Sequence, residues 1–130
     1  MVGMVIVSHS EKIAEGIKEL ATQMAAEVPI ATAGGTKDGR LGTDGEKILR
    51  AINEVYSEDG VIILFDIGSA YMSTEIALEL LDKDRKEKVI LLDTALVEGA
   101  ITAAIECSLN QSLEDIQREL STLRIQKSPL

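Results

Sequence analysis

The amino-acid sequence predicts an α/β fold, a doubly wound and mainly parallel sheet of about four strands flanked by helices. Four runs of apolar, often β-branched residues are continuous rather than alternating, which is typical of strands buried on both faces. Amphipathic helical patterns separate these runs, and the connections between them are short. Strands that alternate with helices in this way indicate right-handed βαβ crossovers.

The four expected strands are 2–7 (VGMVIV), 28–33 (VPIATA), 60–66 (GVIILFD) and 88–93 (KVILLD). The second run is shorter in its apolar part than the others and contains a proline. Because a parallel sheet is covered on both sides, these strands need helices on each face.

Five helices are expected from apolar residues that recur every three or four positions. In the first helix the apolar face consists of Ile13, Ile17, Leu20, Ala21 and Met24. In the second it consists of Ile48, Leu49, Ile52 and Val55, after a predicted capping box over 43–46 in which Thr43 and Glu46 are the paired residues.

The third expected helix carries Met72, Ile76, Leu80 and Leu81 and ends at the charged stretch DKDRKEK. A fourth runs over 96–108, and a fifth starts near Ser112 and carries Leu113, Ile116, Leu120 and Leu123. The sequence shows no internal repeat or linker. We therefore expect a single domain over 1–125, followed by a loose C-terminal tail over 126–130.

Composition excludes several classes of function. The 130-residue chain is 45% hydrophobic, enough for a core without disulfides, and its net charge is −9. That charge argues against nucleic acid or an anionic membrane as partner, and favours either a basic partner surface or simple solubility. No run is long enough to span a bilayer, and no signal peptide is expected.

The chain has one cysteine and one histidine, too few for a four-ligand zinc site. Cys107 lies in a helical pattern, where a small buried hydrophobe is the expected reading. A lone cysteine fits a reducing compartment, so we expect a cytoplasmic protein.

The single histidine, His9, comes directly after the first expected strand, between Ser8 and Ser10. Asp66 ends the third. Ligands and chemistry in such sheets collect beyond the carboxyl ends of the strands, and the first and third strands are expected neighbours. His9 and Asp66 should therefore pair. A carboxylate that accepts one ring N–H leaves the other nitrogen as a nucleophile, and phosphoryl transfer to it would give a phosphohistidine.

Donors for the phosphate are expected around this histidine. Ser10 and the backbone N–H groups at the start of the first helix favour an anion. The glycine loop at Gly34 and Gly35, with Gly68 and Ser69, could bring further N–H and hydroxyl donors.

Structural readings stay open beside this one. A lone histidine is often structural or merely solvated, and Asp66 could instead cap the third helix. The glycines could simply form a long loop. Asp93, at the end of the fourth strand, is a weaker candidate for direct participation.

Several familiar sites are absent from the sequence. There is no G-x-G-x-x-G after the first strand, no P-loop, no G-x-S-x-G elbow, and no acidic pair of the kind a receiver domain places after its first strand. These absences weaken dinucleotide binding, P-loop ATP binding, Ser-His-Asp hydrolysis and receiver-type signalling.

Three blocks carry a resemblance to a known family: VIVSHSEKIAEGIKELA, ATAGGTKDGRLGTDGEKI and VIILFDIGSA. Together they resemble the mannose-family EIIA domain of the bacterial phosphoenolpyruvate-dependent phosphotransferase system (PTS). More closely, they are similar to the phosphotransfer subunits (DhaM) of PTS-dependent dihydroxyacetone kinases. The second block and the end of the chain near residue 130, without a linker to an EIIB domain, favour the kinase subunit. Longer relatives append HPr-like domains, so this chain is expected to use a separate HPr.

The resemblance implies a phosphorelay in which HPr phosphorylates His9 and Asp66 orients the imidazole. Phospho-His9 would then phosphorylate ADP on the subunit DhaL, and the resulting ATP would phosphorylate dihydroxyacetone on DhaK. ADP and magnesium would belong to the partner, so no cofactor is expected on this chain. A homodimer is also implied. The alternatives are a sugar-transport EIIA domain and a non-enzymatic regulatory docking module.

Overall fold

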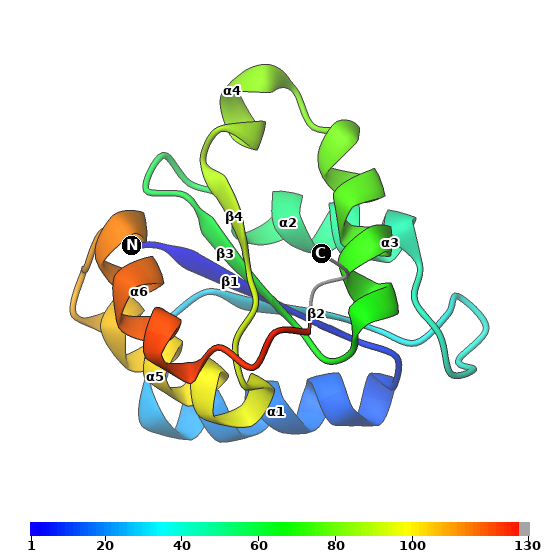
Figure 1. Ribbon diagram of the computed structural model, residues 1–130, viewed down its shortest axis with the longest axis horizontal. Coiled ribbons are helices and arrows are strands. Elements are labelled where there is room, and N and C mark those ends of the chain that lie inside the picture. Colours follow the sequence, from blue (N-terminus) through cyan, green and yellow to red (C-terminus); the bar gives the residue numbers. More distant parts are fainter. Residues whose placement is uncertain (128–130) are drawn as a thin grey trace.

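The computed structural model describes residues 1–127 and contains a four-stranded, all-parallel sheet of order β2-β1-β3-β4 (Figure 1). Its strands are β1 (Gly3–Ser8), β2 (Ile30–Gly34), β3 (Val61–Phe65) and β4 (Val89–Leu92). The predicted fold class is confirmed. β2 begins two residues later than expected because Pro29 has no N–H to give to the sheet, although its carbonyl accepts the N–H of Met4.

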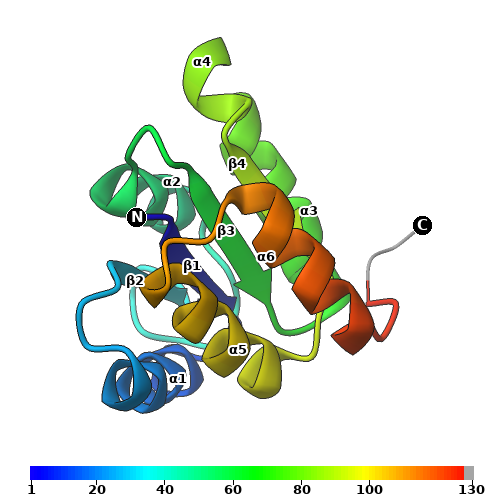
Figure 2. The same cartoon turned by 90° about the vertical axis from the view of Figure 1, so that its left-hand side faces the viewer.

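Two layers of helices enclose the sheet. One face is covered by α1 (Glu11–Met24), α5 (Leu96–Ser108) and α6 (Leu113–Leu120). Figure 2 shows α6 partly in front of the strands and α1 and α5 below them. The other face is covered by α2 (Gly45–Val55) and α3 (Gly68–Glu79). Each layer closes its own apolar core against the strands, as the continuous apolar runs require. Among residues 1–127, no helix is both long and apolar enough to cross a membrane.

Two short elements were not expected. The stretch DKDRKEK contains a one-turn helix, α4 (Lys83–Lys86), because the Asp82 side chain accepts the N–H of Arg85 and caps a new turn. The end of the fifth expected helix is instead a separate 3₁₀ turn, Ser121–Leu123.

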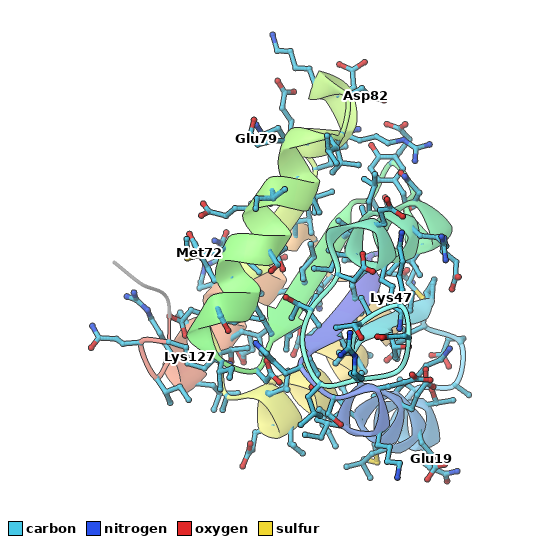
Figure 3. The ribbon with its side chains drawn as sticks, turned by 90° about the vertical axis from the view of Figure 1, so that its right-hand side faces the viewer. Glu19, Lys47, Met72, Glu79, Asp82 and Lys127 are labelled. Atoms are coloured by element: carbon cyan, nitrogen blue, oxygen red, sulfur yellow. The ribbon has the colours of Figure 1, made fainter. Side chains whose placement is uncertain are left out.

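The buried faces of α1 and α3 differ from the expected ones. In α1 the expected core residues Ile13, Leu20 and Met24 are 45–57% exposed, and in the third expected helix Met72, Ile76 and Leu80 are 58–65% exposed. Figure 3 shows Met72 on the outer side of α3. Of the residues expected on the buried face of α1, Ile17 and Ala21 are buried. The other contacts come from small side chains, Ala14 in α1 and Ala70, Thr74 and Ala77 in α3. They bring the helices close to the sheet and leave the larger residues outside.

The predicted capping box before α2 is wrong. Asp44 is the N-cap, and its Oδ1 accepts the N–H groups of Glu46 at 2.8 Å and Lys47 at 3.4 Å. Thr43 lies one residue earlier, and its hydroxyl is 2.6 Å from the hydroxyl of Ser73 on α3. This contact joins the glycine loop to α3 rather than closing α2.

The C-terminal segment is not loose where the structure describes it. The N–H of Lys127 donates to Asp93 Oδ1 at 3.0 Å, and its ammonium donates to the carbonyl of Phe65. The expected tail therefore crosses the carboxyl edge of the sheet at Lys127. The rest of that tail, 128–130, lies outside the described residues.

Candidate functional site

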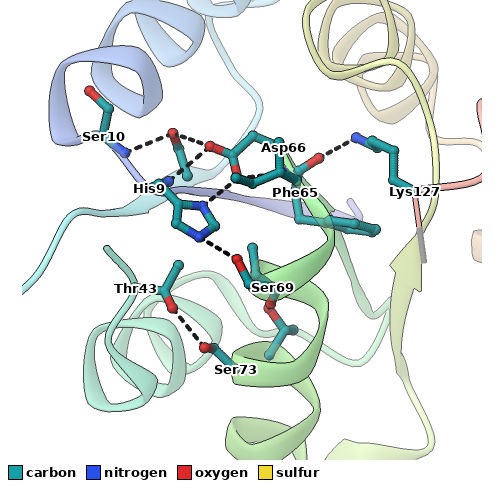
Figure 4. A network of polar contacts seen from close by, with 12 residues as sticks. His9, Ser10, Thr43, Phe65, Asp66, Ser69, Ser73 and Lys127 are labelled. Atoms are coloured by element: carbon teal, nitrogen blue, oxygen red, sulfur yellow. Dashed lines mark hydrogen bonds and ion pairs between the residues drawn. The ribbon is translucent and has the colours of Figure 1, made fainter. Parts of the chain in front are cut away.

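His9 and Asp66 follow adjacent strands and are paired (Figure 4). β1 pairs with β3 so that Val7 lies opposite Phe65, which brings the next residues of both strands to one level. His9 Nδ1 is 2.9 Å from Asp66 Oδ1, and the His9 N–H donates to Asp66 Oδ2 at 2.9 Å. The predicted pairing is confirmed, and both side chains keep partial access to solvent.

Asp66 is held by further donors. The Ser8 hydroxyl donates to Oδ2 at 2.8 Å, and the Ile67 N–H donates to Oδ1 at 2.7 Å. Partial burial alone would raise the pKa of Asp66, but the hydrogen bonds from His9, Ile67 and Ser8 outweigh it and hold the pKa below its usual value. The alternative role as cap of α3 does not hold, since the N-cap of that helix is Ile67.

The ionised Asp66 fixes the tautomer of His9. A carboxylate only accepts hydrogen bonds, so we assign the ring proton to Nδ1 and the lone pair to Nε2. Nε2 is 2.6 Å from Ser69 Oγ, and in this tautomer the serine hydroxyl is the donor. The nitrogen free to react is therefore Nε2, with Ser69 in front of it.

Nε2 faces the start of α3, where Gly68 and Ser69 were expected to bring further donors, and not the start of α1, where the phosphate itself was expected. At α1, the Ser10 hydroxyl already accepts the N–H of Ile13, and the Ser10 N–H donates to Ser8 Oγ. By contrast, α3 has no side-chain cap, and its first-turn N–H groups, at Gly68 and Ser69, have no acceptor within the helix. An anion bound to Nε2 would meet the positive end of α3.

Gly34 and Gly35 have a structural role here. A Cβ on Gly34 would lie 2.7 Å from the Ser10 carbonyl oxygen and from Glu11 Cα, so this glycine allows α1 to pass close to β2. Gly35 has a φ of +73°, and its N–H donates to the Ser8 carbonyl at 3.1 Å. The expected donation from Gly35 to a phosphate conflicts with that hydrogen bond.

Two hydroxyls beside the site, those of Thr43 and Ser73, were not predicted from the sequence. Figure 4 shows Thr43 and Ser73 near Ser69, on the side of His9 to which Nε2 points. Ser69 and Ser73 lie four residues apart on α3, so they share a face of that helix. That spacing is the signal that could have found Ser73, whereas Thr43 arrives there only through the path of the glycine loop.

Asp93 and Cys107 have other surroundings. Asp93 Oδ1 accepts the Lys127 N–H, and Oδ2 lies 3.9 Å from Nε of Arg124, so the carboxylate holds the C-terminal segment. Cys107 is fully buried in α5, and burial raises the pKa of its thiol to about 12. The thiol is neutral at physiological pH and behaves as a small core residue.

Comparison with known proteins adds to this geometry. Residues 3–117 match the family model EIIA-man, described as the PTS system fructose IIA component. The match covers every element that positions His9, Asp66 and Ser69.

Among curated relatives, the chain is 45% identical over 124 residues to "PEP-dependent dihydroxyacetone kinase 2, phosphoryl donor subunit DhaM" of Listeria innocua, covering 95% of this chain and 99% of that protein. It is 42% identical over 123 residues to the DhaM subunit of Providencia stuartii, covering 92% of this chain but only 26% of that longer protein. A solved structure titled as a protein of unknown function, EF1359, shares 40% identity with a TM-score of 0.84 and covers 93% of each chain.

Proposed function

Because this chain belongs to the EIIA-man family and to its DhaM phosphoryl donor subunits, we propose that it is a phosphohistidine carrier whose acceptor atom is His9 Nε2. One observation carries the proposal. Nδ1 is hydrogen-bonded to the carboxylate of Asp66 at 2.9 Å, while Nε2 faces Ser69 and the start of α3, which has no side-chain cap. Phosphoryl transfer needs this positioning and charge stabilisation more than elaborate covalent chemistry.

The transfer step is a displacement at phosphorus. The Nε2 lone pair forms the new N–P bond while the bond between phosphorus and the donor's leaving atom breaks, and that atom keeps the electron pair. The Nδ1 proton stays between the ring and Asp66, which stabilises the positive charge on the ring. The Ser69 hydroxyl turns from Nε2 to a phosphoryl oxygen. Transfer onward is the same displacement with His9 as leaving group.

The partners belong to the same proposal. HPr is the phosphoryl donor, and ADP bound with magnesium on a DhaL subunit is the acceptor, with dihydroxyacetone held on DhaK. This chain itself carries no cofactor, acts in the cytoplasm and forms a homodimer. The name of the Listeria relative, a phosphoryl donor subunit of a dihydroxyacetone kinase, supports this assignment.

The carrier function is tested by incubating the protein with phosphoenolpyruvate, enzyme I and HPr. We expect one acid-labile, base-stable phosphate per chain, and none in His9→Ala. An unlabelled wild-type protein, or a label that survives in His9→Ala, would contradict the proposal. Retention of full biological activity by His9→Ala would instead support a docking module that does not use the histidine.

The acceptor is tested with the phosphorylated protein. Addition of DhaL–ADP, DhaK and dihydroxyacetone should yield dihydroxyacetone phosphate, whereas a mannose-type EIIB domain should take little phosphate. Preferential transfer to EIIB would identify a sugar-transport EIIA instead.

A further inference from the structure

A lysine ammonium adjoins the His9–Asp66 pair at the carboxyl end of β3. The ammonium of Lys127 donates to the carbonyl of Phe65, the residue before Asp66, and lies 4.6 Å from the centre of the Phe65 ring (Figure 4). Figure 3 shows Lys127 beside the first turn of α3. The lysine therefore stands next to both parts of the site, the carboxylate and the helix start.

The segment that carries Lys127 is held in place. The Lys127 N–H donates to Asp93 Oδ1, and the Leu123 carbonyl accepts the N–H of Ala95 at 2.9 Å. A Cβ on Gly68 would lie 2.9 Å from the Lys127 carbonyl oxygen. Glycine at 68 thus lets the C-terminal segment pass against the start of α3.

The surroundings of Lys127 are partly shielded from water. Burial lowers the pKa of Lys127, while the nearby charges of Asp93 and Asp66 act in the opposite direction. The ammonium is therefore within electrostatic reach of Asp66. Because the site is partly desolvated, that interaction is screened less than one at the open surface.

We propose that Lys127 is a positioning residue of this site, whose fixed ammonium offsets the negative charge that a phosphoryl group on His9 would bring next to Asp66. The inference rests on the proposed function. A phosphoryl group adds up to about two negative charges beside a carboxylate that is already ionised. In a chain with net charge −9, a cation held beside the site makes that accumulation less unfavourable.

Other charged groups stand around the same edge. Arg124 lies 3.9 Å from Asp93, and Lys47 donates to the Gly34 carbonyl at 3.0 Å on the β2 side of His9. Of these three cations, Lys127 is the one that donates to the carbonyl of Phe65, the residue before Asp66. The charge effect should therefore be specific to Lys127 and not a general effect of positive charge.

The test uses the full-length phosphorylated protein and two readouts. The first is the ³¹P NMR pH titration of the phosphoryl group, and the second is the phosphorylated fraction at equilibrium with phospho-HPr. In Lys127→Met and Lys127→Gln the ³¹P midpoint should move to higher pH by about 0.3–1 unit, because a lost cation destabilises the dianion. The ratio of phosphorylated to free protein should fall about 3- to 10-fold.

Two variants serve as controls. Lys127→Arg keeps the charge and should restore most of both values. Arg124→Gln removes a cation from the same segment without touching the Phe65 carbonyl, and should match wild type. Thermal unfolding shows which variants keep the fold. Two neutral substitutions are made at Lys127 so that the test still works if one of them does not fold.

The outcomes separate the inference from the proposed function. If wild type takes no phosphate on His9, the proposed function fails and this inference with it. If wild type is phosphorylated and a folded neutral variant keeps its ³¹P midpoint and equilibrium, the role of Lys127 is overturned while the carrier function stands. An equal effect in Arg124→Gln would also overturn it, since the charge effect would then be general.

Discussion

At His9 the two ring nitrogens have different partners, and in the proposed function this difference decides which of them accepts the phosphoryl group. Nδ1 is bound to Asp66, and Nε2 faces the hydroxyl of Ser69. The pair could be predicted from the sequence, because a histidine and an aspartate each follow a strand of one parallel sheet. The contact with Ser69 depends on how α3 leaves β3, which no sequence pattern here specifies.

Replacing Asp66 tests the tautomer assignment. In Asp66→Asn, the side-chain amide can donate to the ring and stabilise the wrong tautomer. We expect phosphorylation of His9 to slow by about 10²- to 10⁴-fold, by analogy with the same change in serine-protease triads. Single-turnover labelling measures the rate, with circular dichroism as the control for folding. An unchanged rate would remove the orienting role of Asp66.

The same carboxylate makes stability depend on pH. Since the pKa of Asp66 is lower in the folded state, its contribution is fully present above the unfolded value of about 4. That contribution is lost as the pH falls through the folded-state pKa. Urea unfolding between pH 7 and pH 3 should show wild type losing more stability than Asp66→Asn. Parallel curves for the two proteins would contradict the assignment.

At the scale of the elements, the strands were easier to predict than the helix faces. Continuous apolar runs identified all four strands, whereas large residues of α1 and α3 turned out to be exposed. Hydrophobic periodicity weights large side chains, but small ones such as Ala14 and Ala77 set the closest approach of a helix to the sheet. The path of the C-terminal segment was missed for a similar reason, because it depends on the absence of a side chain at Gly68.

The corrected cap of α2 gives a prediction at this scale. Asp44→Ala should lower the free energy of unfolding by about 1 kcal/mol, because two N–H groups of the first turn lose their acceptor. Glu46→Ala is the matched variant, since its described partner is the exposed Lys37 and ion pairs at the open surface contribute little to stability. Chemical denaturation measures both. A larger loss of stability in Glu46→Ala than in Asp44→Ala would instead favour the capping box predicted from the sequence.

For the whole molecule, two helix layers enclose a sheet whose one polar edge carries the site. The fold class followed from the alternation of elements, and the acidic charge placed no constraint on it. Cys107 lies fully buried in the layer formed by α1, α5 and α6, far along α5 from its first residue, Leu96. The reactivity of its thiol can therefore show whether the whole molecule unfolds cooperatively.

We expect the Cys107 thiol to react with a disulfide reagent only when the protein unfolds. Burial raises the pKa of the thiol to about 12, so almost no thiolate exists in the native state. Labelling in increasing urea should follow the global unfolding transition seen by circular dichroism. Fast labelling under native conditions would show that the α5 layer opens independently of the rest.

In the proposed function His9 carries a phosphoryl group on Nε2 while Asp66 holds Nδ1. The most direct measurement is ¹H–¹⁵N correlation NMR of the ¹⁵N-histidine-labelled protein after phosphorylation by phosphoenolpyruvate, enzyme I and HPr. Because the chain has a single histidine, the spectrum contains one imidazole. We expect coupling of phosphorus to Nε2 and a proton retained at Nδ1. Phosphorus on Nδ1, or an unmodified ring under conditions that phosphorylate a known EIIA domain, would contradict it.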